Sequence, residues 1–352
     1  KNIYKNLTAL RDKIKSSKDL KKHQKQVKSV EKEITIFHAK AVNEVLKKTK
    51  VNVDFIGFHG QTIFHDAEEK ITKQLGDGKL LSKLTKKKVV YDFRQNDLKN
   101  GGEGAPIAPV FHSLLVKQNK ISTPVCILNI GGIANITYVR TSNDLNLLKS
   151  KDIGPGNCLI DEWVRKNKKG NYDENGRLAR KGKAYEPTNE IVQAVIQAGL
   201  IGTIKNILLG YSNKQTKDIK NFSIFLHFVE YHGLSVEDGA ATLTEATAKI
   251  ISSGLKSLYS DHKGIDFKIL VCGGGRKNKF LMKRIKELSD LHDVWGLKIF
   301  QPIDDHGIDG DFIESQAFAY LAIRSFLGLP ITFPNTTGCK EPCTGGVVVK
   351  NF

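Results

Sequence analysis

The chain has 352 residues, of which 40% are hydrophobic and 26% charged, and its formal net charge is +18. No run approaches the roughly 18 apolar residues that span a bilayer, so no membrane partner is expected. The charge would suit a nucleic acid or an anionic substrate. However, the lysines are spread over many segments without interleaved aromatic residues, so general lysine enrichment explains the charge better and no nucleic-acid partner is expected.

The five cysteines are odd in number and scattered, which favours reduced thiols in a cytoplasmic protein. They are Cys126, Cys158, Cys272, Cys339 and Cys343. The last two are close together, but no histidine or further cysteine accompanies them, which argues against a zinc site. Residues 1–28 are charged and lack the apolar core of a signal peptide.

Apolar residues recur at three- and four-residue steps from residue 27, which predicts an amphipathic helix ending near Lys50. A short strand over residues 53–58 runs into the polar stretch His59-Gly60-Gln61-Thr62. Ligands of open α/β folds collect at such strand ends, so His59 and Gln61 are candidate binding residues. A core histidine is the alternative for His59.

A second strand, over residues 89–91, ends in Asp92-Phe93-Arg94. Arg94 is a candidate clamp for a carboxylate or phosphate, because its planar guanidinium can bind two oxygens at once. The alternative is a salt bridge to Asp92 or Asp97. The following stretch, Gly101-Gly102-Glu103-Gly104-Ala105-Pro106, is too rich in glycine for regular structure and predicts a loop.

The central stretch contains two glycine-rich turns. Asn129-Ile130-Gly131-Gly132-Ile133-Ala134-Asn135 lies between two apolar runs, which predicts a hairpin. Asp152-Ile153-Gly154-Pro155-Gly156-Asn157 precedes a predicted helix from Cys158, whose exposed amides would suit an anion. Asp152, on a tight turn at a strand–helix junction, is either a catalytic base or a helix cap, and both interpretations stay open.

Further helices are predicted over residues 186–207 and 236–259. A buried strand then ends in Gly273-Gly274-Gly275, and Asn278 follows. Glycines at a strand–helix junction permit flat contact with a planar or phosphate-bearing ligand. Past an acidic loop, Glu314 opens the last long helix, where it either favours the helix N-terminus electrostatically or faces a cleft.

The order of these motifs closely resembles that of the anhydro-N-acetylmuramic acid kinases over roughly residues 25–345. The motifs are His59 to Thr62, Asp92 to Arg94 with Asp97, Gly101 to Pro106, Asn129 to Asn135, Asp152 to Asn157 with Asp161, Cys272 to Gly275 with Asn278, and Glu314 with Ala317-Phe318-Ala319. The resemblance implies an α/β, two-lobed actin/hexokinase-like (ribonuclease H-like) fold with ATP in an interlobe cleft. The expected lobes are residues 1–122 and 123–352, and the last helix could return to the first lobe.

The resemblance also implies an unusual double reaction in the recycling of bacterial cell wall. Water opens the 1,6-anhydro ring of the sugar at its anomeric carbon, and the freed 6-oxygen takes the γ-phosphoryl group of ATP. The product would be N-acetylmuramic acid 6-phosphate. ATP and Mg²⁺ are the implied cofactors, a small sugar is the substrate, and a homodimer is plausible.

By resemblance, Asp152 is the base that activates water, and Glu314 assists it. The geometry would be that of an inverting glycosidase, with carboxyl groups about 6.5–9.5 Å apart. Residues that would contact the nucleotide are Gly131, Gly132, Gly154, Gly156, Asn157, Gly273, Gly274, Gly275 and Asn278. Residues that would hold the sugar are His59, Gln61, Asp92, Arg94 and Glu103, with Arg94 on its lactyl carboxylate. Asp161 is the rival candidate for the base. As a helical residue nine positions after Asp152, it is expected to position Asp152 or the metal instead.

Two features depart from the family pattern. No Gly-Thr-Ser-x-Asp-Gly phosphate loop with its hairpin precedes the first helix, so either the native protein has residues before Lys1 or it has lost this loop. In addition, residues 214–218 stand where the family usually carries a Ser-Thr-Gly-Arg-Glu-like run. A catalytically impaired member of the same fold that binds sugar or nucleotide is therefore the alternative to an active kinase.

Overall fold

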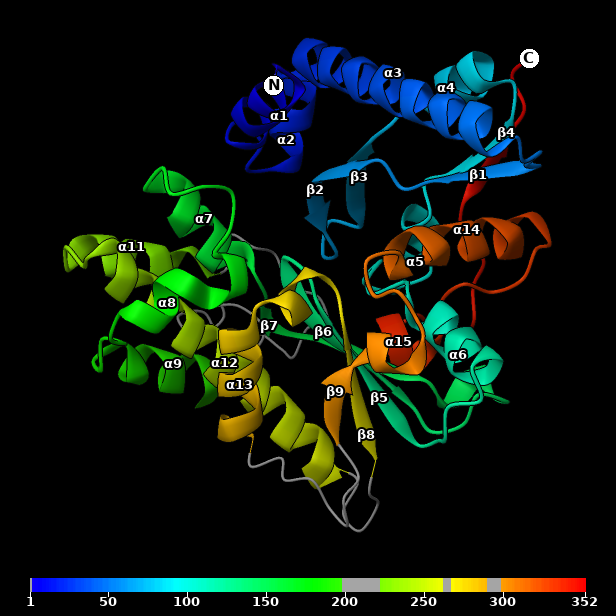
Figure 1. The fold of residues 1–352 in the computed structure, drawn as a ribbon. Helices are drawn as coiled ribbons and strands as arrows, with labels where there is room; N and C mark the ends of the chain where they lie inside the picture. Colours follow the sequence, from blue (N-terminus) through cyan, green and yellow to red (C-terminus); the bar gives the residue numbers. More distant parts are fainter. Residues whose placement is uncertain (1, 198–221, 262–266, 290–298) are drawn as a thin grey trace. The chain divides into compact units, whose positions relative to one another are not determined.

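The computed structural model describes residues 2–197, 222–261, 267–289 and 299–352 (Figure 1). The chain divides into two compact units, which are residues 1–111 with 314–352 and residues 112–313. Each unit combines helices with a β-sheet, so the α/β class predicted from the sequence is confirmed. The predicted lobe boundary at residue 122 stays a prediction.

The first unit contains a three-stranded sheet in the order β1-β4-β10. Strands β1 (Phe55–Phe58) and β4 (Lys88–Tyr91) are parallel, and β10 (Val347–Val349) pairs antiparallel with β4. The predicted amphipathic helix is present as α3 (Gln24–Thr49), and it ends at Lys50 in the left-handed conformation. The other helices of this unit are α1 (Asn2–Arg11), α2 (Ser17–Lys22), α4 (Gly78–Thr85), α5 (Gln95–Lys99), α14 (Ile313–Phe326) and α15 (Pro334–Thr337), and α6 (Pro109–Gln118) crosses into the second unit.

Helix α3 covers two parts of the first unit with one apolar face. Its Ala39 packs with Phe58, Leu81 and Val89 of the three-stranded sheet and α4. Nearer its N-terminus it packs on a hairpin of β2 (Gln61–Asp66) and β3 (Ile71–Leu75) that the sequence did not predict. The hairpin pairing shifts register between Thr62 and Phe64, so the adjacent residues Ile63 and Phe64 are both buried. This bulge removes the period-2 alternation by which a strand is recognised.

The second unit is built on a five-stranded sheet in the order β7-β6-β5-β8-β9. Strands β5 (Val125–Ile130), β6 (Ile133–Val139) and β7 (Lys149–Pro155) form an antiparallel meander, which confirms the predicted hairpin at Gly131-Gly132. Strands β8 (Lys268–Cys272) and β9 (Phe300–Pro302) continue the sheet parallel to β5. Because β5 and β8 run in parallel, their carboxyl ends lie at the same edge of the sheet.

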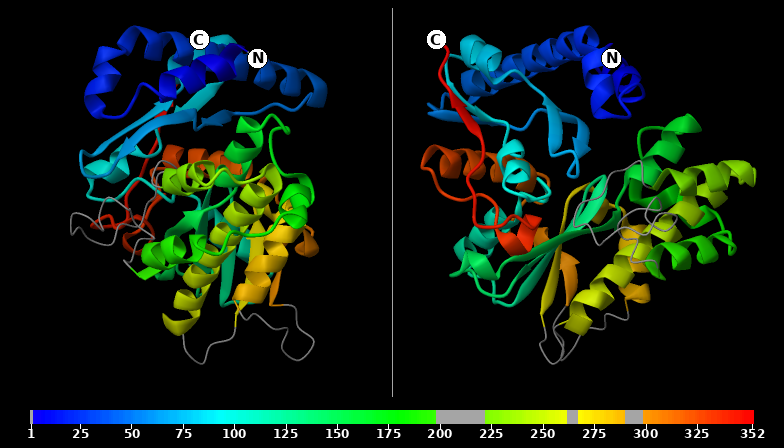
Figure 2. Two further views of the ribbon diagram at one scale, coloured as in Figure 1. Left: turned by 90° about the vertical axis from the view of Figure 1, so that its left-hand side faces the viewer. Right: turned by 180° about the vertical axis from the view of Figure 1, so that it is seen from behind.

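Helices pack against this sheet through one continuous apolar core. The long predicted helix is present as α12 (Val236–Asp261), which packs against β7, α7, α8 and α13 (Figure 2). The other helices are α7 (Cys158–Lys166), α8 (Arg177–Lys181), α9 (Thr188–Gln197), α11 (Ser223–Tyr231) and α13 (Lys279–Leu288), with 3₁₀ turns η1 (Leu145–Leu147), η2 (Glu174–Gly176), η4 (Gly274–Lys277) and η5 (Ile303–His306). Residues 198–207 of the predicted helix and the departure at residues 214–218 lie outside the described residues.

Over the described ranges, no helix combines the length and the apolar character needed to cross a membrane. All five cysteines are buried and free of disulfide bonds, as expected from their spacing.

Candidate active site

A row of polar side chains crosses the second unit's sheet where β5 and β8 end. The strand register pairs Cys272 with Asn129, Asn129 with Asn135, and Asn135 with Asp152. Directly paired residues on neighbouring strands project to the same face, so these four side chains share one face of the sheet. Asp152 is only 9% exposed. The carboxylate predicted to be a base therefore stands at the end of a polar row.

The structure corrects the predicted position of Asp152. The residue lies inside strand β7 and not on a tight turn. Helix α7 begins at Cys158 with Asn157 as its N-cap residue. The helix-cap interpretation of Asp152 is therefore wrong, whereas its role as a base stays a prediction.

The two glycine turns of the central stretch are bonded to each other. The amides of Gly156 and Asn157 donate to the carbonyls of Gly132 and Gly131 at 2.9 and 2.7 Å, and the amide of Cys158 donates to Gly132 at 3.4 Å. The Asn157 side chain adds a bond to the Ile130 carbonyl at 3.4 Å. These three amides are thus occupied by bonds between the two turns. Only the amide of Cys158 belongs to helix α7, so the expectation that the amides of this helix suit an anion stays a prediction.

The candidate glycines divide into two kinds. A Cβ atom on Gly154, Gly156, Gly273 or Gly275 would collide with neighbouring atoms of the second unit, so packing alone requires glycine there. A Cβ on Gly131 would lie 3.6 Å from the Ile133 carbonyl oxygen, and one on Gly274 would lie 3.5 Å from Asn157 Nδ2, which are ordinary van der Waals contacts. Gly131 and Gly274 are therefore the glycines whose faces leave room for another group.

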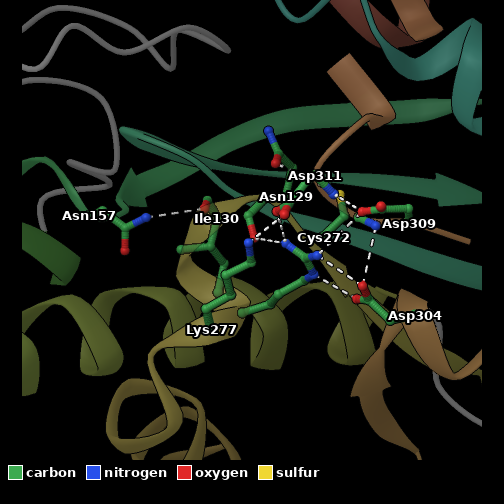
Figure 3. A network of polar contacts seen from close by, with 11 residues as sticks. Asn129, Ile130, Asn157, Cys272, Lys277, Asp304, Asp309 and Asp311 are labelled. Atoms are coloured by element: carbon green, nitrogen blue, oxygen red, sulfur yellow. Dashed lines mark hydrogen bonds and ion pairs between the residues drawn. The ribbon is translucent and has the colours of Figure 1, made fainter. Parts of the chain in front are cut away.

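Arg276 holds the triple-glycine turn against the acidic loop. The carboxylates of this loop, Asp304, Asp309 and Asp311, lie close together in the same polar network as Cys272 and Lys277 (Figure 3). Its guanidinium donates to both carboxylate oxygens of Asp304 at 2.6 and 2.9 Å, to Asp311 at 2.8 Å and to the Gly273 carbonyl at 3.0 Å. The hydrogen bonds from Arg276 lower the pKa of Asp304 to about 2. Asn278, the predicted adenosine contact, caps α13 by accepting the Leu281 amide at 3.0 Å.

The predicted sugar-binding residues belong to the first unit. His59 and Asp92 directly follow the parallel strands β1 and β4, whose last residues, Phe58 and Tyr91, are paired. Arg94 donates to His59 Nε2 at 3.1 and 3.2 Å and to the Gly104 carbonyl at 2.8 Å. The structure thus brings His59 and Arg94 together, as the sequence predicted, and also places the Gly104 carbonyl of the glycine-rich loop against Arg94.

His59 is held in its neutral form. Burial, and secondly the charge of Arg94, lower the pKa of His59 to about 3. Because Nε2 accepts from Arg94, the proton is assigned to Nδ1, which lies 3.0 Å from the Gly60 carbonyl. Its ring packs on Phe318 with the centroids 4.5 Å apart.

The remaining predicted residues of the first unit surround this cluster in different ways. Asp92 adopts the left-handed conformation with φ of 58°, and burial raises its pKa. Gln61 is exposed at the start of β2. The Glu103 amide donates to the Thr337 carbonyl at 2.8 Å. Glu314 is exposed in the first turn of α14, one helical turn before Phe318 and on the same helix face.

Asp161 lies on α7 and is half-buried. Burial raises its pKa to about 6, Arg165 opposes this and the nearby Asp173 adds to it. Asp173 itself accepts the Leu178 and Ala179 amides at 2.8 and 3.0 Å. A carboxyl group with such a pKa changes its charge near neutral pH, which is common at functional sites.

Comparison with known proteins identifies the family of the chain. The model of the family described as anhydro-N-acetylmuramic acid kinase matches residues 3–351. The chain belongs to the anhydro-N-acetylmuramic acid kinase family. The resemblance read from the motifs, and the kinase function that goes with it, are confirmed.

Several curated members of the family are similar over most of their length. The anhydro-N-acetylmuramic acid kinase of Pelagibacter ubique is 53% identical over 350 residues, covering 99% of this chain and 88% of the relative. The anhydro-N-acetylmuramic acid kinase of Zymomonas mobilis is 39% identical over 316 residues, which cover 89% of this chain and 78% of the relative. Among solved structures, an activator of the 2-hydroxyisocaproyl-CoA dehydratase from Clostridium difficile with bound ADPNP matches 62% of this chain and 68% of its own at 14% identity. Its TM-score of 0.36 is too low to decide the fold.

Three residues of the site were not predicted from the sequence. Asn129 and Asn135 were noted as parts of a motif but not as site residues, although a polar residue in an otherwise apolar strand was an available signal. Arg276 was not singled out. Its carboxylate partners follow 28 and 35 positions later, which no local pattern reveals.

Proposed function

We propose that this chain hydrolyses the 1,6-anhydro bond of anhydro-N-acetylmuramic acid and phosphorylates the freed O6 with ATP, as a cytoplasmic enzyme of cell-wall recycling. The observation that carries the proposal is the placement of Asp152, nearly buried, at the end of the polar row and four positions before Gly156, where the two glycine turns bond to each other. The candidate base and the two interlocked turns thereby lie on one sheet.

In this mechanism Asp152 takes the proton of a water molecule as the water oxygen bonds to the anomeric carbon. The bond between the anomeric carbon and O6 breaks, and O6 attacks the γ-phosphorus, so that ADP leaves. Glu314 assists at the sugar. Asp152 belongs to the second unit and Glu314 to the first, so the separation of their carboxyl groups stays a prediction.

The nucleotide is proposed to lie over the open faces of Gly131 and Gly274. Phosphoryl transfer needs mainly positioning and charge neutralisation, and the two turns are already fixed by bonds between backbone groups and by Arg276. Mg²⁺ would neutralise phosphate charge and be held mainly by ATP. Asp161 is the candidate protein ligand, since both oxygens of the neighbouring Asp173 are bonded to amides.

The sugar is proposed to bind at His59, Gln61, Asp92, Arg94 and Glu103. Arg94 bonds His59 through Nε and Nη2 and the Gly104 carbonyl through Nη1, and these bonds fix the plane of its guanidinium. A planar fork held in this way suits the lactyl carboxylate. Together with the strand order of the second unit, these assignments support a two-lobed, actin/hexokinase-like fold with the nucleotide on one lobe and the sugar on the other.

The test is ADP release from MgATP with and without the anhydro sugar, run in heavy-oxygen water. We expect sugar-dependent ADP release and one heavy oxygen in the phosphorylated product. Asp152→Asn should lower turnover by about 10²–10⁴-fold with little change in binding. The matched control is Asp144→Asn, at an exposed residue of the same unit, which should leave turnover unchanged. Turnover of Asp152→Asn within a few-fold of the parent would exclude Asp152 as the base, and sugar binding without turnover would identify an impaired member of the family.

A further inference from the structure

A buried cluster of one carboxyl group and two thiols lies in the first unit, behind the glycine-rich loop and made of residues that are not assigned to sugar or nucleotide. The ligand atoms of Asp97, Cys339 and Cys343 all lie within 4.8 Å of one another. The three residues are 1%, 2% and 8% exposed. The sequence argued against a zinc site because nothing accompanied the two cysteines, but the missing ligand is contributed from 246 positions away.

The distances match those of a tetrahedral thiolate site. The sulfur of Cys343 lies 3.6 Å from Asp97 Oδ1. Zinc bonds of about 2.3 Å to sulfur and about 2.0–2.2 Å to oxygen would separate the two ligand atoms by about 3.5 Å. The Thr332 hydroxyl lies 3.0 Å from the sulfur of Cys343 and 4.0 Å from that of Cys339. The spacing Cys-x₃-Cys also falls within the range of zinc ligand pairs.

We propose that Asp97, Cys339 and Cys343 bind one thiophilic divalent cation, zinc. On binding, two metal–sulfur bonds form, two S–H bonds break and two protons leave for solvent, with no change of oxidation state. An ordinary thiol is protonated at neutral pH, so each cysteine gives up one proton when its sulfur becomes a ligand.

The site has an entry path and a connection to the sugar residues. Lys340, Glu341 and Pro342, which separate the two cysteines, are all exposed, so the thiols lie directly beneath a surface loop. Asp97 Oδ2 accepts the Gly104 amide at 2.7 Å, and the Gly104 carbonyl accepts from Arg94. A cation on Oδ1 would therefore join the C-terminal tail to the loop that orients Arg94.

The experiment titrates the reduced full-length chain, without nucleotide, with Co²⁺ and then with Zn²⁺. We expect a sulfur-to-cobalt charge-transfer band that saturates at one equivalent, its loss on adding one equivalent of zinc, and release of two protons per zinc. Cys339→Ser and Cys343→Ser should each weaken binding by at least 100-fold. Cys158→Ser is the matched control, since Cys158 is as buried as Cys343 but lies in the other unit, and it should keep the band.

The absence of a band at one equivalent, or a band of unchanged strength and affinity in the two serine variants, would overturn the proposal. Should Cys343→Ser fail to fold, Cys339→Ser and Asp97→Asn decide the matter, and the latter should weaken zinc binding by about 10–100-fold while two sulfurs remain bound. Proton release of fewer than two per zinc in the parent chain would equally contradict a two-thiolate site.

Discussion

Arg94 and Arg276 each donate to the carbonyl of a glycine-rich loop, but the side chains that they bond differ. Arg276 bonds the Gly273 carbonyl and also two carboxylates, Asp304 and Asp311. Arg94 bonds the Gly104 carbonyl and a histidine that the site keeps neutral. Two carboxylates bonded to one guanidinium make Arg276 a structural group that fixes its loop. Bonds to a carbonyl and a neutral ring fix the plane of the Arg94 guanidinium, and an oriented planar group fits the proposed role of Arg94 in binding a carboxylate.

The strongest test of this contrast is the pH dependence of His59. Its pKa is lowered to about 3 in the folded chain from 6.5, so stability is lost as pH falls from about 6.5 toward 3. Linkage gives a loss of about 3 kcal/mol between pH 7 and pH 4 from this group. In the His59→Gln variant, whose amide oxygen can still accept from Arg94, the loss of stability that His59 causes should disappear. Urea unfolding at each pH measures the free energy of unfolding. His227→Gln, at an exposed histidine, is the control and should leave the dependence unchanged.

Removal of Arg276 should cost stability more than activity. Arg276→Ala leaves Asp304 and Asp311 close together without their cation, and we expect a loss of about 2–3 kcal/mol in the free energy of unfolding, less than for a fully buried pair because both carboxylates are partly exposed. Urea denaturation measures it. Arg165→Ala, at an exposed arginine of the same unit, should change stability by no more than about 0.5 kcal/mol. Equal losses in the two variants would remove the structural role assigned to Arg276.

Removal of Arg94 should act mainly on the sugar. Arg94→Lys keeps the charge but loses the planar fork, and we expect KM for the anhydro sugar to rise about 10–30-fold, or about 2 kcal/mol, with KM for ATP unchanged. Steady-state kinetics with each substrate varied in turn measure this, and Arg276→Lys is the comparison. If Arg94→Lys raised the KM of ATP alone, the assignment of the first unit's cluster to the sugar would be wrong.

The smallest expected effect concerns Asp161. The pKa of Asp161 is raised to about 6, so the folded chain favours the protonated carboxyl group. The stability that this group contributes is fully present below about pH 4 and is lost as the pH rises through 6. The half-buried position reduces the effect to on the order of 1 kcal/mol. The Asp161→Asn variant should lack this decline in stability between pH 4 and pH 8. Thermal unfolding at both pH values measures it. Asp144→Asn should keep the parent's pH dependence, and a decline that persisted in Asp161→Asn would assign it to another group.

The sequence by itself determined the family, the hairpin at Gly131-Gly132, the helices α3 and α12, and the strand ends that bear His59 and Asp92. These features rest on local chemistry, because apolar periodicity, glycine turns and polar strand ends are all written within a few residues. The order of such motifs was enough to recognise a kinase.

Only the tertiary structure decided which groups meet. Asp152 proved to lie in a strand, since its pairing with Asn135 depends on a bulge that no periodicity shows. Likewise the partners of Arg276 and the carboxylate beside Cys343 are far away along the chain. Local patterns fix the conformation of a segment, but the contacts between distant segments follow from how their apolar faces pack, and that packing brings together the charges and thiols on which the chemistry depends.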